Sequence, residues 1–270
     1  MAIGEAYRLI KDGYMDRMIV GGLDFNCNQN VLPGMDAFGA LCTTHNKSPE
    51  DACKPFDVNR SGTVVSDGGA MILLESEEFA LKRKAKQIYA EVIGYGQTND
   101  AHHILRPYDN GLGILAAIMA SVNDAGIHPL DIDAVNCHAR STVSGDNSEA
   151  YCLHSLFACG NKIKSAGDFA KLAPEEVINY YDKGLPENQP VLFGQKGHLG
   201  HAVAAAAAIE TVFSFLSIKH QHIPEIKNLK EPLEPKMNFA LKNHSRKVDV
   251  VLKNGFVFGG VNCSILYKKY

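Results

Sequence analysis

The chain has 270 residues, 46% hydrophobic and 21% charged, a balance typical of globular proteins that excludes disordered, collagenous and coiled-coil classes. Its 27 Lys and Arg against 30 Asp and Glu give a net charge of −3 without any basic block, so nucleic acid is not an expected partner. The longest apolar run, 202–209, is far shorter than a membrane span. Seven cysteines, an odd number without CxxC spacing, indicate a reducing compartment and argue against disulfides and structural zinc.

The first third of the chain predicts alternating helices and strands. The amphipathic segment 2–12 predicts a helix and differs from the apolar core of a signal peptide. The elements that follow are a strand at 16–22, a loop over 22–62 with a short helix at 35–41, a strand at 68–74, a charged helix at 75–86 and a half-buried strand at 87–96.

A second alternation follows. Its predicted elements are a helix at 111–125, a strand at 132–136, a loop at 137–145, a helix at 146–157, a strand at 191–192, a helix at 199–218 and strands at 248–254 and 257–267. Residues 161–187 differ, with Ser165 as an N-cap and Pro174 opening a second helix, and predict a helical insert on the surface. The alternation predicts an α/β fold in layers.

Three clusters of polar residues and glycines carry the candidate chemistry. In the first, over 136–149, His138 directly follows a predicted strand, where it could act as a general base or donate to an oxyanion. The alternative is a structural loop histidine.

The second cluster is the segment 196–201, which opens a helix of small residues. Its His198 and His201 could suggest a metal, but no third ligand has motif spacing, so no metal is expected; an ordinary core helix is the alternative. The third is the glycine-rich segment 254–262, a weak pattern by itself.

Together and in this order, the three clusters resemble the β-ketoacyl-acyl-carrier-protein synthases of the 3-oxoacyl synthase II type. The family's His-Gly-Thr-x-Thr-x-x-Gly-Asp motif is matched by 138–146, its Lys and Gly-His by Lys196 and 200–201, and its Asn-x-Phe-Gly-Phe-Gly-Gly-x-Asn by 254–262. The segment 54–62 also resembles the family's Arg-Pro-Phe-Asp-x-x-Arg-x-Gly.

The resemblance implies a thiolase-like layered α-β-α fold, with the end of the N-terminal half in residues 1–100 and the C-terminal half in 101–270. It implies that His138 and His201 stabilise a thioester oxyanion and assist malonyl decarboxylation, that Lys196 orients one of them, and that no cofactor is needed. The other implied site residues are the pocket gate Phe256 and Phe258, the surrounding Ser141, Thr142, Gly259 and Gly260, and the supporting Asp146, Glu149 and Asn262.

The sequence also departs from the family pattern. Ala139 and Arg140 stand where the family has Gly and Thr, and Val257 stands between the two phenylalanines in place of Gly. By position, the nucleophilic cysteine would precede Met1, and none of the seven cysteines replaces it; Cys137 follows a strand and has no helix N-terminus to lower its pKa. We therefore expect that the chain lacks the nucleophile and that, alone, it could at most decarboxylate a malonyl group without transferring an acyl group.

Three hypotheses follow for its role. The first is a degenerate synthase kept as a non-catalytic structural subunit of a larger complex. The second is one chain of a split or truncated 3-oxoacyl synthase, and the third is a module that binds acyl carrier protein. All three need a partner to cover the surface that the missing half would bury. A mitochondrial location is expected, and a cytoplasmic one is the alternative.

Overall fold

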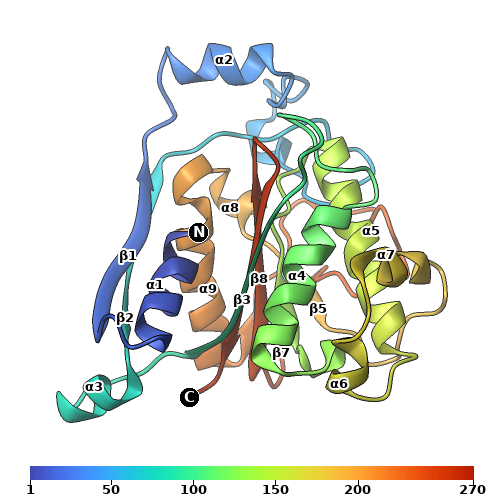
Figure 1. Ribbon diagram of the computed structural model, residues 1–270. Coiled ribbons are helices and arrows are strands. Elements are labelled where there is room, and N and C mark those ends of the chain that lie inside the picture. The colour runs from blue at the N-terminus through green and yellow to red at the C-terminus, as the bar shows by residue number, and fades with distance from the viewer.

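The computed structural model describes residues 1–270 and is built around a mixed five-stranded sheet in the order β3-β9-β8-β4-β5 (Figure 1). Its strands are β3 (Glu91–Asn99), β9 (Val261–Lys268), β8 (Val250–Val257), β4 (Ala134–Asn136) and β5 (Val191–Phe193). The short β4 is parallel to both β5 and β8, whereas β9 is antiparallel to both β3 and β8. Side chains at the end of β4 therefore emerge between β8 and the edge strand β5.

Further layers lie on both faces of this sheet (Figure 1). Helices α4 (Leu112–Ala125) and α5 (Val143–Gly160) cover one face, and α1 (Ala2–Lys11) and α9 (Ala206–His220) cover the other. Beyond α1 and α9 lies a two-stranded antiparallel sheet of β1 (Arg17–Asp24) and β2 (Gly68–Glu75). The predicted layered α/β fold is confirmed. The remaining elements are α2 (Val31–Ala37), α3 (Glu77–Lys82), β6 (His222–Ile223), β7 (His244–Ser245) and the 3-10 turns Pro49–Asp51, Pro129–Asp131, Ile178–Tyr180 and Val203–Ala205.

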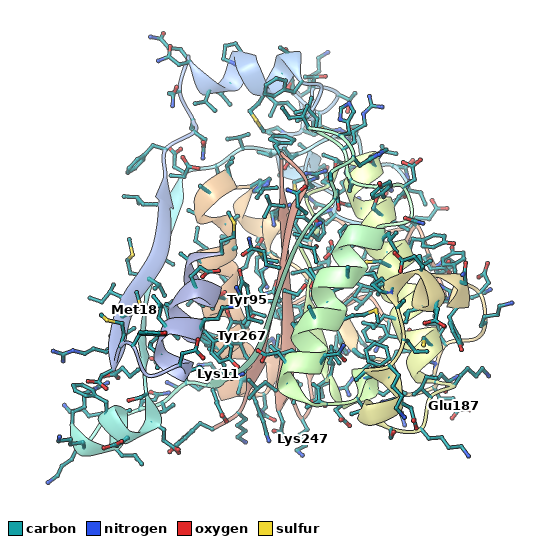
Figure 2. The ribbon with its side chains drawn as sticks, in the orientation of Figure 1. Lys11, Met18, Tyr95, Glu187, Lys247 and Tyr267 are labelled. Atoms are coloured by element: carbon teal, nitrogen blue, oxygen red, sulfur yellow. The ribbon has the colours of Figure 1, made fainter.

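Neighbouring strands β3 and β9 carry two large aromatic side chains that anchor the helices of one face (Figure 2). Tyr267 is fully buried, and its hydroxyl lies 3.1 Å from Oγ1 of Thr211 on α9. Tyr95 packs beneath α1, where a side chain at Gly4 would collide with the tyrosine ring at 2.2 Å. The glycine at that position is thus required by the close approach of α1 to the sheet.

The predicted helix over 199–218 is wrong at its start. A separate turn of helix, α8 (Lys196–Leu199), ends at Gly200, whose φ of 75° is left-handed. A Cβ at Gly200 would lie 3.0 Å from the carbonyl oxygen of Val64, so glycine is needed there for space as well as for conformation. The chain turns at this point and places His201 outside the regular helix, which begins only at Ala206.

The expected surface insert at 161–187 is helical but only partly on the surface. Its helices are α6 (Ala166–Phe169) and α7 (Pro174–Val177), with the Ser165 hydroxyl accepting the N-cap hydrogen bond from the Asp168 amide at 3.1 Å. Phe169 and Val177 are fully buried in the main core. The insert is therefore a packed part of the fold, because its apolar side chains extend the core over α5.

One segment, Val203–His220, is long and apolar enough to cross a membrane, with a mean hydropathy of 1.3. Half of it is buried inside the protein, between β2 and β8. It also carries the buried Glu210, which is paired with two lysines. These contacts are those of a core helix.

Candidate functional site

The loop after β4 holds His138 at the centre of the site. Glu149 on α5 fixes the backbone there, because its two carboxylate oxygens accept from the amides of His138 and Ala139, each at 2.8 Å. The His138 side chain is buried, and its Nε2 has no hydrogen-bond partner. This ring nitrogen is therefore left without a partner in the protein.

The turn at Gly200 brings His201 against His138. The two rings lie 5.3 Å apart between centroids and are nearly perpendicular, at 84°. The Nδ1 of His201 is also buried without a hydrogen-bond partner, and the Phe256 ring packs 4.5 Å from that of His138. The structure thus brings together the two predicted histidines and one predicted gate residue from three distant parts of the chain.

Behind the histidines lies a chain of buried charges. Lys196, only 1% exposed, donates to the backbone oxygen of His138 and to Oε1 of Glu210. The other oxygen of Glu210 lies 2.8 Å from Nζ of Lys253. The sequence analysis missed Glu210 and Lys253. A carboxylate inside an otherwise apolar, small-residue helix was the signal for Glu210, because such a group needs a buried cation as its partner.

This environment sets the protonation of the site. Burial, followed by the charge of Lys196, holds the pKa of both His138 and His201 well below the usual range for histidine, so both are neutral at pH 7. Burial also lowers the pKa of Lys196, against the opposing effect of Glu210, and it raises the pKa of Glu149. A neutral imidazole keeps one N–H, which can donate a hydrogen bond to an oxyanion.

The loop 139–146 is held in a strained conformation by hydrogen bonds within the loop and to the segment 54–62. Asp146 accepts from the amide of Phe56 at 2.8 Å and from the amide of Ser141 at 3.1 Å. The Ser141 hydroxyl accepts from the Lys54 amide at 2.8 Å, which ties the predicted 54–62 segment to the site. Ala139 has a left-handed φ of 44°, a conformation that glycine adopts at lower cost.

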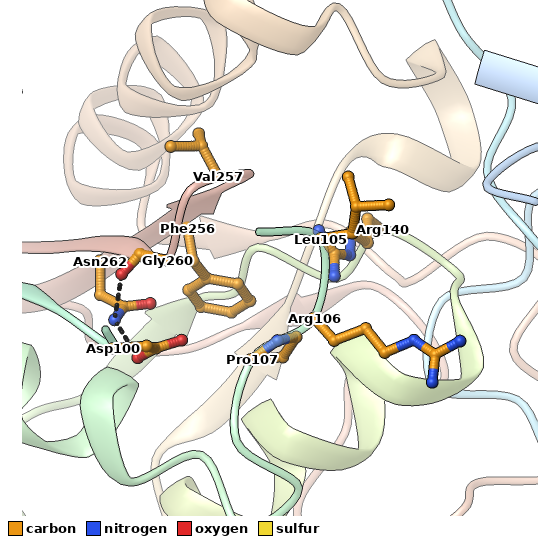
Figure 3. Close-up of a pocket in the computed structure, with 9 residues that line it drawn as sticks. All are labelled: Asp100, Leu105, Arg106, Pro107, Arg140, Phe256, Val257, Gly260 and Asn262. Carbon is orange, nitrogen blue, oxygen red and sulfur yellow. Dashed lines mark hydrogen bonds between the residues drawn. The ribbon is translucent and has the colours of Figure 1, made fainter. Parts of the chain in front are cut away.

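The third predicted cluster forms the tight connection between β8 and β9. Gly259 and Gly260 both have left-handed φ angles, 86° and 74°. Asn262 secures the connection by donating to Oδ1 of Asp100 at 2.7 Å and to the Gly260 oxygen at 3.2 Å (Figure 3). Phe258 stands at the surface, 38% exposed, with its ring 6.1 Å from that of Phe38 in an edge-to-face contact.

A cavity of about 550 Å³ opens beside the histidines. His201, Thr142, Phe256 and Phe258 line it, whereas His138 and Lys196 lie behind its wall. Charged residues gather in the same wall: Arg106, Arg140 and the single carboxylate Asp109. Arg140 donates to Oγ1 of Thr142 at 2.9 Å and also lines the smaller hollow around Phe256 (Figure 3).

None of the seven cysteines lines this cavity. Cys137 is fully buried, its thiol donates to the Val135 oxygen at 3.6 Å, and burial raises its pKa well above normal. Burial also raises the pKa of Cys53 to about 12. Such thiols are poor nucleophiles, since the thiolate is the reactive form.

The two histidines of the 196–201 segment do not share a metal. The Nε2 of His198 lies 3.0 Å from the backbone oxygen of Glu225, and this exposed side chain is engaged outside the cavity. His201 faces His138 instead.

Comparison with known families finds two matches. The model of the beta-ketoacyl synthase C-terminal domain matches residues 89–167 and 175–230, and that of the N-terminal domain matches residues 1–80. A mitochondrial 3-oxoacyl-acyl-carrier-protein synthase of Arabidopsis thaliana is 35% identical over 98% of this chain and 53% of its own length. A 3-oxoacyl-acyl-carrier-protein synthase 2 of Rhizobium meliloti is 35% identical over 100% of this chain and 58% of its own.

Solved structures agree with these matches. A type II polyketide ketosynthase in complex with its acyl-carrier protein aligns with a TM-score of 0.83 and 27% identity over 99% of this chain and 60% of that one. A ketosynthase in complex with its chain length factor aligns with a TM-score of 0.74 and 23% identity, over 99% of this chain and 57% of that one. The ketosynthase matches confirm the thiolase-like fold. The chain spans just over half the length of these relatives.

Proposed function

Because the chain belongs to the β-ketoacyl synthase family, we propose that it carries the histidine half of a 3-oxoacyl-acyl-carrier-protein synthase site. The observation that carries the proposal is the perpendicular pair His138 and His201, neutral, buried and each with an unpartnered ring nitrogen, beside a cavity large enough for an acyl thioester arm. Residues 1–100 would then end the N-terminal half of the fold and 101–270 form the C-terminal half.

The chemistry assigned to this half is the decarboxylation of a malonyl thioester. The histidines would donate hydrogen bonds to the thioester oxygen, whose charge grows as the C–C bond to the carboxylate breaks and CO₂ leaves. The resulting enolate takes a proton, or its carbon attacks the carbonyl of an acyl group held on a cysteine, and the C–S bond to that cysteine then breaks to release the thiolate. Lys196 would position the loop of His138 through its hydrogen bond to the backbone oxygen of that residue.

The cysteine of the full reaction would come from polypeptide outside these 270 residues, because none of the seven cysteines lines the cavity. The surface favours such a partner: β1 and β2 expose apolar side chains over one whole face. Arg106 and Arg140 in the cavity wall suit the phosphate of a carrier arm, so we propose acyl carrier protein as a second partner. A mitochondrial site of action fits the Arabidopsis relative, whereas the Rhizobium relative is bacterial.

A specific observation favours the alternative of a non-catalytic structural subunit. Arg140 places a cation in the cavity wall, and this charge contributes to lowering the pKa of both histidines. A scaffold could keep the fold and the charge network while its cavity no longer accepts substrate.

The deciding assay measures CO₂ release from malonyl-acyl carrier protein by the full chain, with and without the cysteine-containing half of a relative. We expect slow release by the chain alone and 3-oxoacyl product only with the added half. His201→Asn should abolish CO₂ release. The control is His198→Asn, which changes an exposed histidine two positions before the turn at Gly200 and should retain CO₂ release.

Arg140→Thr separates the two candidates. It restores the residue type of the family motif and should increase turnover if the site is catalytic. If neither the wild type nor Arg140→Thr releases CO₂ above the level of His201→Asn, with or without the added half, the catalytic proposal is wrong and the structural role stands.

A further inference from the structure

We propose that His154, Asp182 and Glu234 form a binding site for one divalent transition-metal ion of the zinc type, which fastens the 161–187 insert to the body of the protein. The site lies away from the histidine pair, and this inference does not depend on the proposed function.

The three side chains come from three separate segments. His154 lies in the middle of α5, Asp182 follows the last turn of the insert, and Glu234 belongs to the loop that precedes the backbone pairing with β5. One ligand atom from each lies within 4.8 Å of the others, and Nδ1 of His154 is 3.8 Å from Oε2 of Glu234. Small rotations of the two carboxylates would bring all three atoms within coordination distance of one ion.

The buried nitrogen of His154 supports a metal site independently of the distances between the three side chains. The side chain is 1% exposed, and its Nδ1 has no hydrogen-bond partner. A buried polar atom without a partner is costly and rare, and here it faces a carboxylate. A metal ion between the two would satisfy both groups.

The surroundings hold these groups in place. Tyr181 donates from its hydroxyl to Oε2 of Glu234 at 3.2 Å, and its ring stacks on that of Tyr151 with 4.0 Å between centroids. Two carboxylates face one imidazole, so the site carries the negative charge that favours a dication.

The ligand set selects the class of ion. Zinc accepts imidazole nitrogen together with carboxylate oxygen, whereas magnesium and calcium prefer oxygen ligands alone. Cysteine thiolates, the softer ligands, are absent from this cluster. The sequence showed no metal motif because the three ligands are 28 and 52 residues apart along the chain, and only the fold brings them together.

The test uses the full chain without an affinity tag, stripped of metal with a chelator and titrated with Zn²⁺. We expect one ion per chain and a Tm that rises by about 5–10 °C at 100 times the Kd. Magnesium and calcium should give no such rise. Titration with Co²⁺ should give a spectrum of nitrogen and oxygen ligands without thiolate charge transfer, which distinguishes this site from binding by cysteines.

Variants at the less buried ligands keep the test independent of folding. Asp182→Asn and Glu234→Gln should each weaken Zn²⁺ binding at least about tenfold. The control Glu187→Gln, at an exposed carboxylate of the same insert, should leave it unchanged (Figure 2). Binding that is absent, equal in all variants, or accompanied by thiolate charge transfer would overturn the proposal.

Discussion

Buried ionisable residues dominate the energetics of the site. Glu210 is shared by Lys196 and Lys253, so three charges lie out of water with only one carboxylate between two cations. Such a cluster adds little to stability compared with apolar residues of the same size. Its presence is therefore better explained by the field that it creates at His138 than by the needs of the fold, since strongly perturbed groups gather at functional sites.

The low pKa of both histidines predicts that the protein is sensitive to acid. Below about pH 6.5 the unfolded chain binds protons at these residues that the folded chain does not, so the free energy of unfolding falls as the pH falls. Two such groups should lower it by about 2–3 kcal/mol between pH 7.5 and 5.5, as measured by urea unfolding. Burial raises the pKa of Glu149, and a carboxylate with a raised pKa acts in the opposite direction, so this figure is the contribution of the two histidines alone.

The same measurement on His201→Asn should show about half of this loss, because one of the two histidines is removed. His198→Asn should show the wild-type loss, since that side chain is exposed. A wild-type protein whose stability does not change over this range would contradict the neutral state of the pair.

At this scale, the motifs predicted which side chains meet but not what surrounds them. His138, His201 and Phe256 lie together as the three clusters implied. Glu210 escaped prediction because its partners lie 14 and 43 positions away, a distance at which local spacing carries no information.

Glycines of β3 control how closely the elements pack. At Gly96 a Cβ would lie 2.0 Å from the Ala117 oxygen and 2.7 Å from the Ser121 amide nitrogen, both backbone atoms of α4. Because the backbone of a packed helix cannot move aside cheaply, Gly96→Ala should lower the free energy of unfolding by about 1–3 kcal/mol. Chemical denaturation measures this change.

The matched control is Gly34→Ala in α2, where a Cβ would meet nothing within 4 Å. Alanine in an open helical position should be neutral or stabilising by about 0.5–1 kcal/mol. Equal effects of the two substitutions would mean that α4 does not approach β3 as closely as described.

Helices and strands with a clear periodicity of hydrophobic residues were predictable from the sequence. Features that depend on contacts between residues far apart in the sequence were not. The strands of the β8–β9 pair and helix α4 lie close to the predicted ranges. The helix expected at 199–218 is interrupted because Gly200 must pass Val64, a residue far away in sequence. The burial of Phe169 likewise depends on α5, so the local pattern could not distinguish a surface insert from a packed one.

At the scale of the whole molecule, the outer sheet is covered on one side only. Val20 and Ile72, paired across β1 and β2, face α1 and α9 and are buried. On the opposite face the apolar side chains are exposed: Ile19 75%, Leu23 60% and Met71 63%. A continuous apolar face of this kind is uncommon on a monomer and indicates a surface that other polypeptide covers.

This face predicts that the purified chain associates with itself when no partner is present. Replacing Ile19 and Met71 with threonine removes apolar surface while preserving residues suited to a strand, and should weaken self-association by about tenfold or more. Sedimentation velocity over a range of concentrations measures the effect. The control Ile104→Thr removes an equally exposed side chain from a loop beside Gly259, away from the outer sheet, and should associate as the wild type does. A wild-type chain that stays monomeric at high concentration would show that this face needs no cover, and the argument for a partner on β1 and β2 would fail with it.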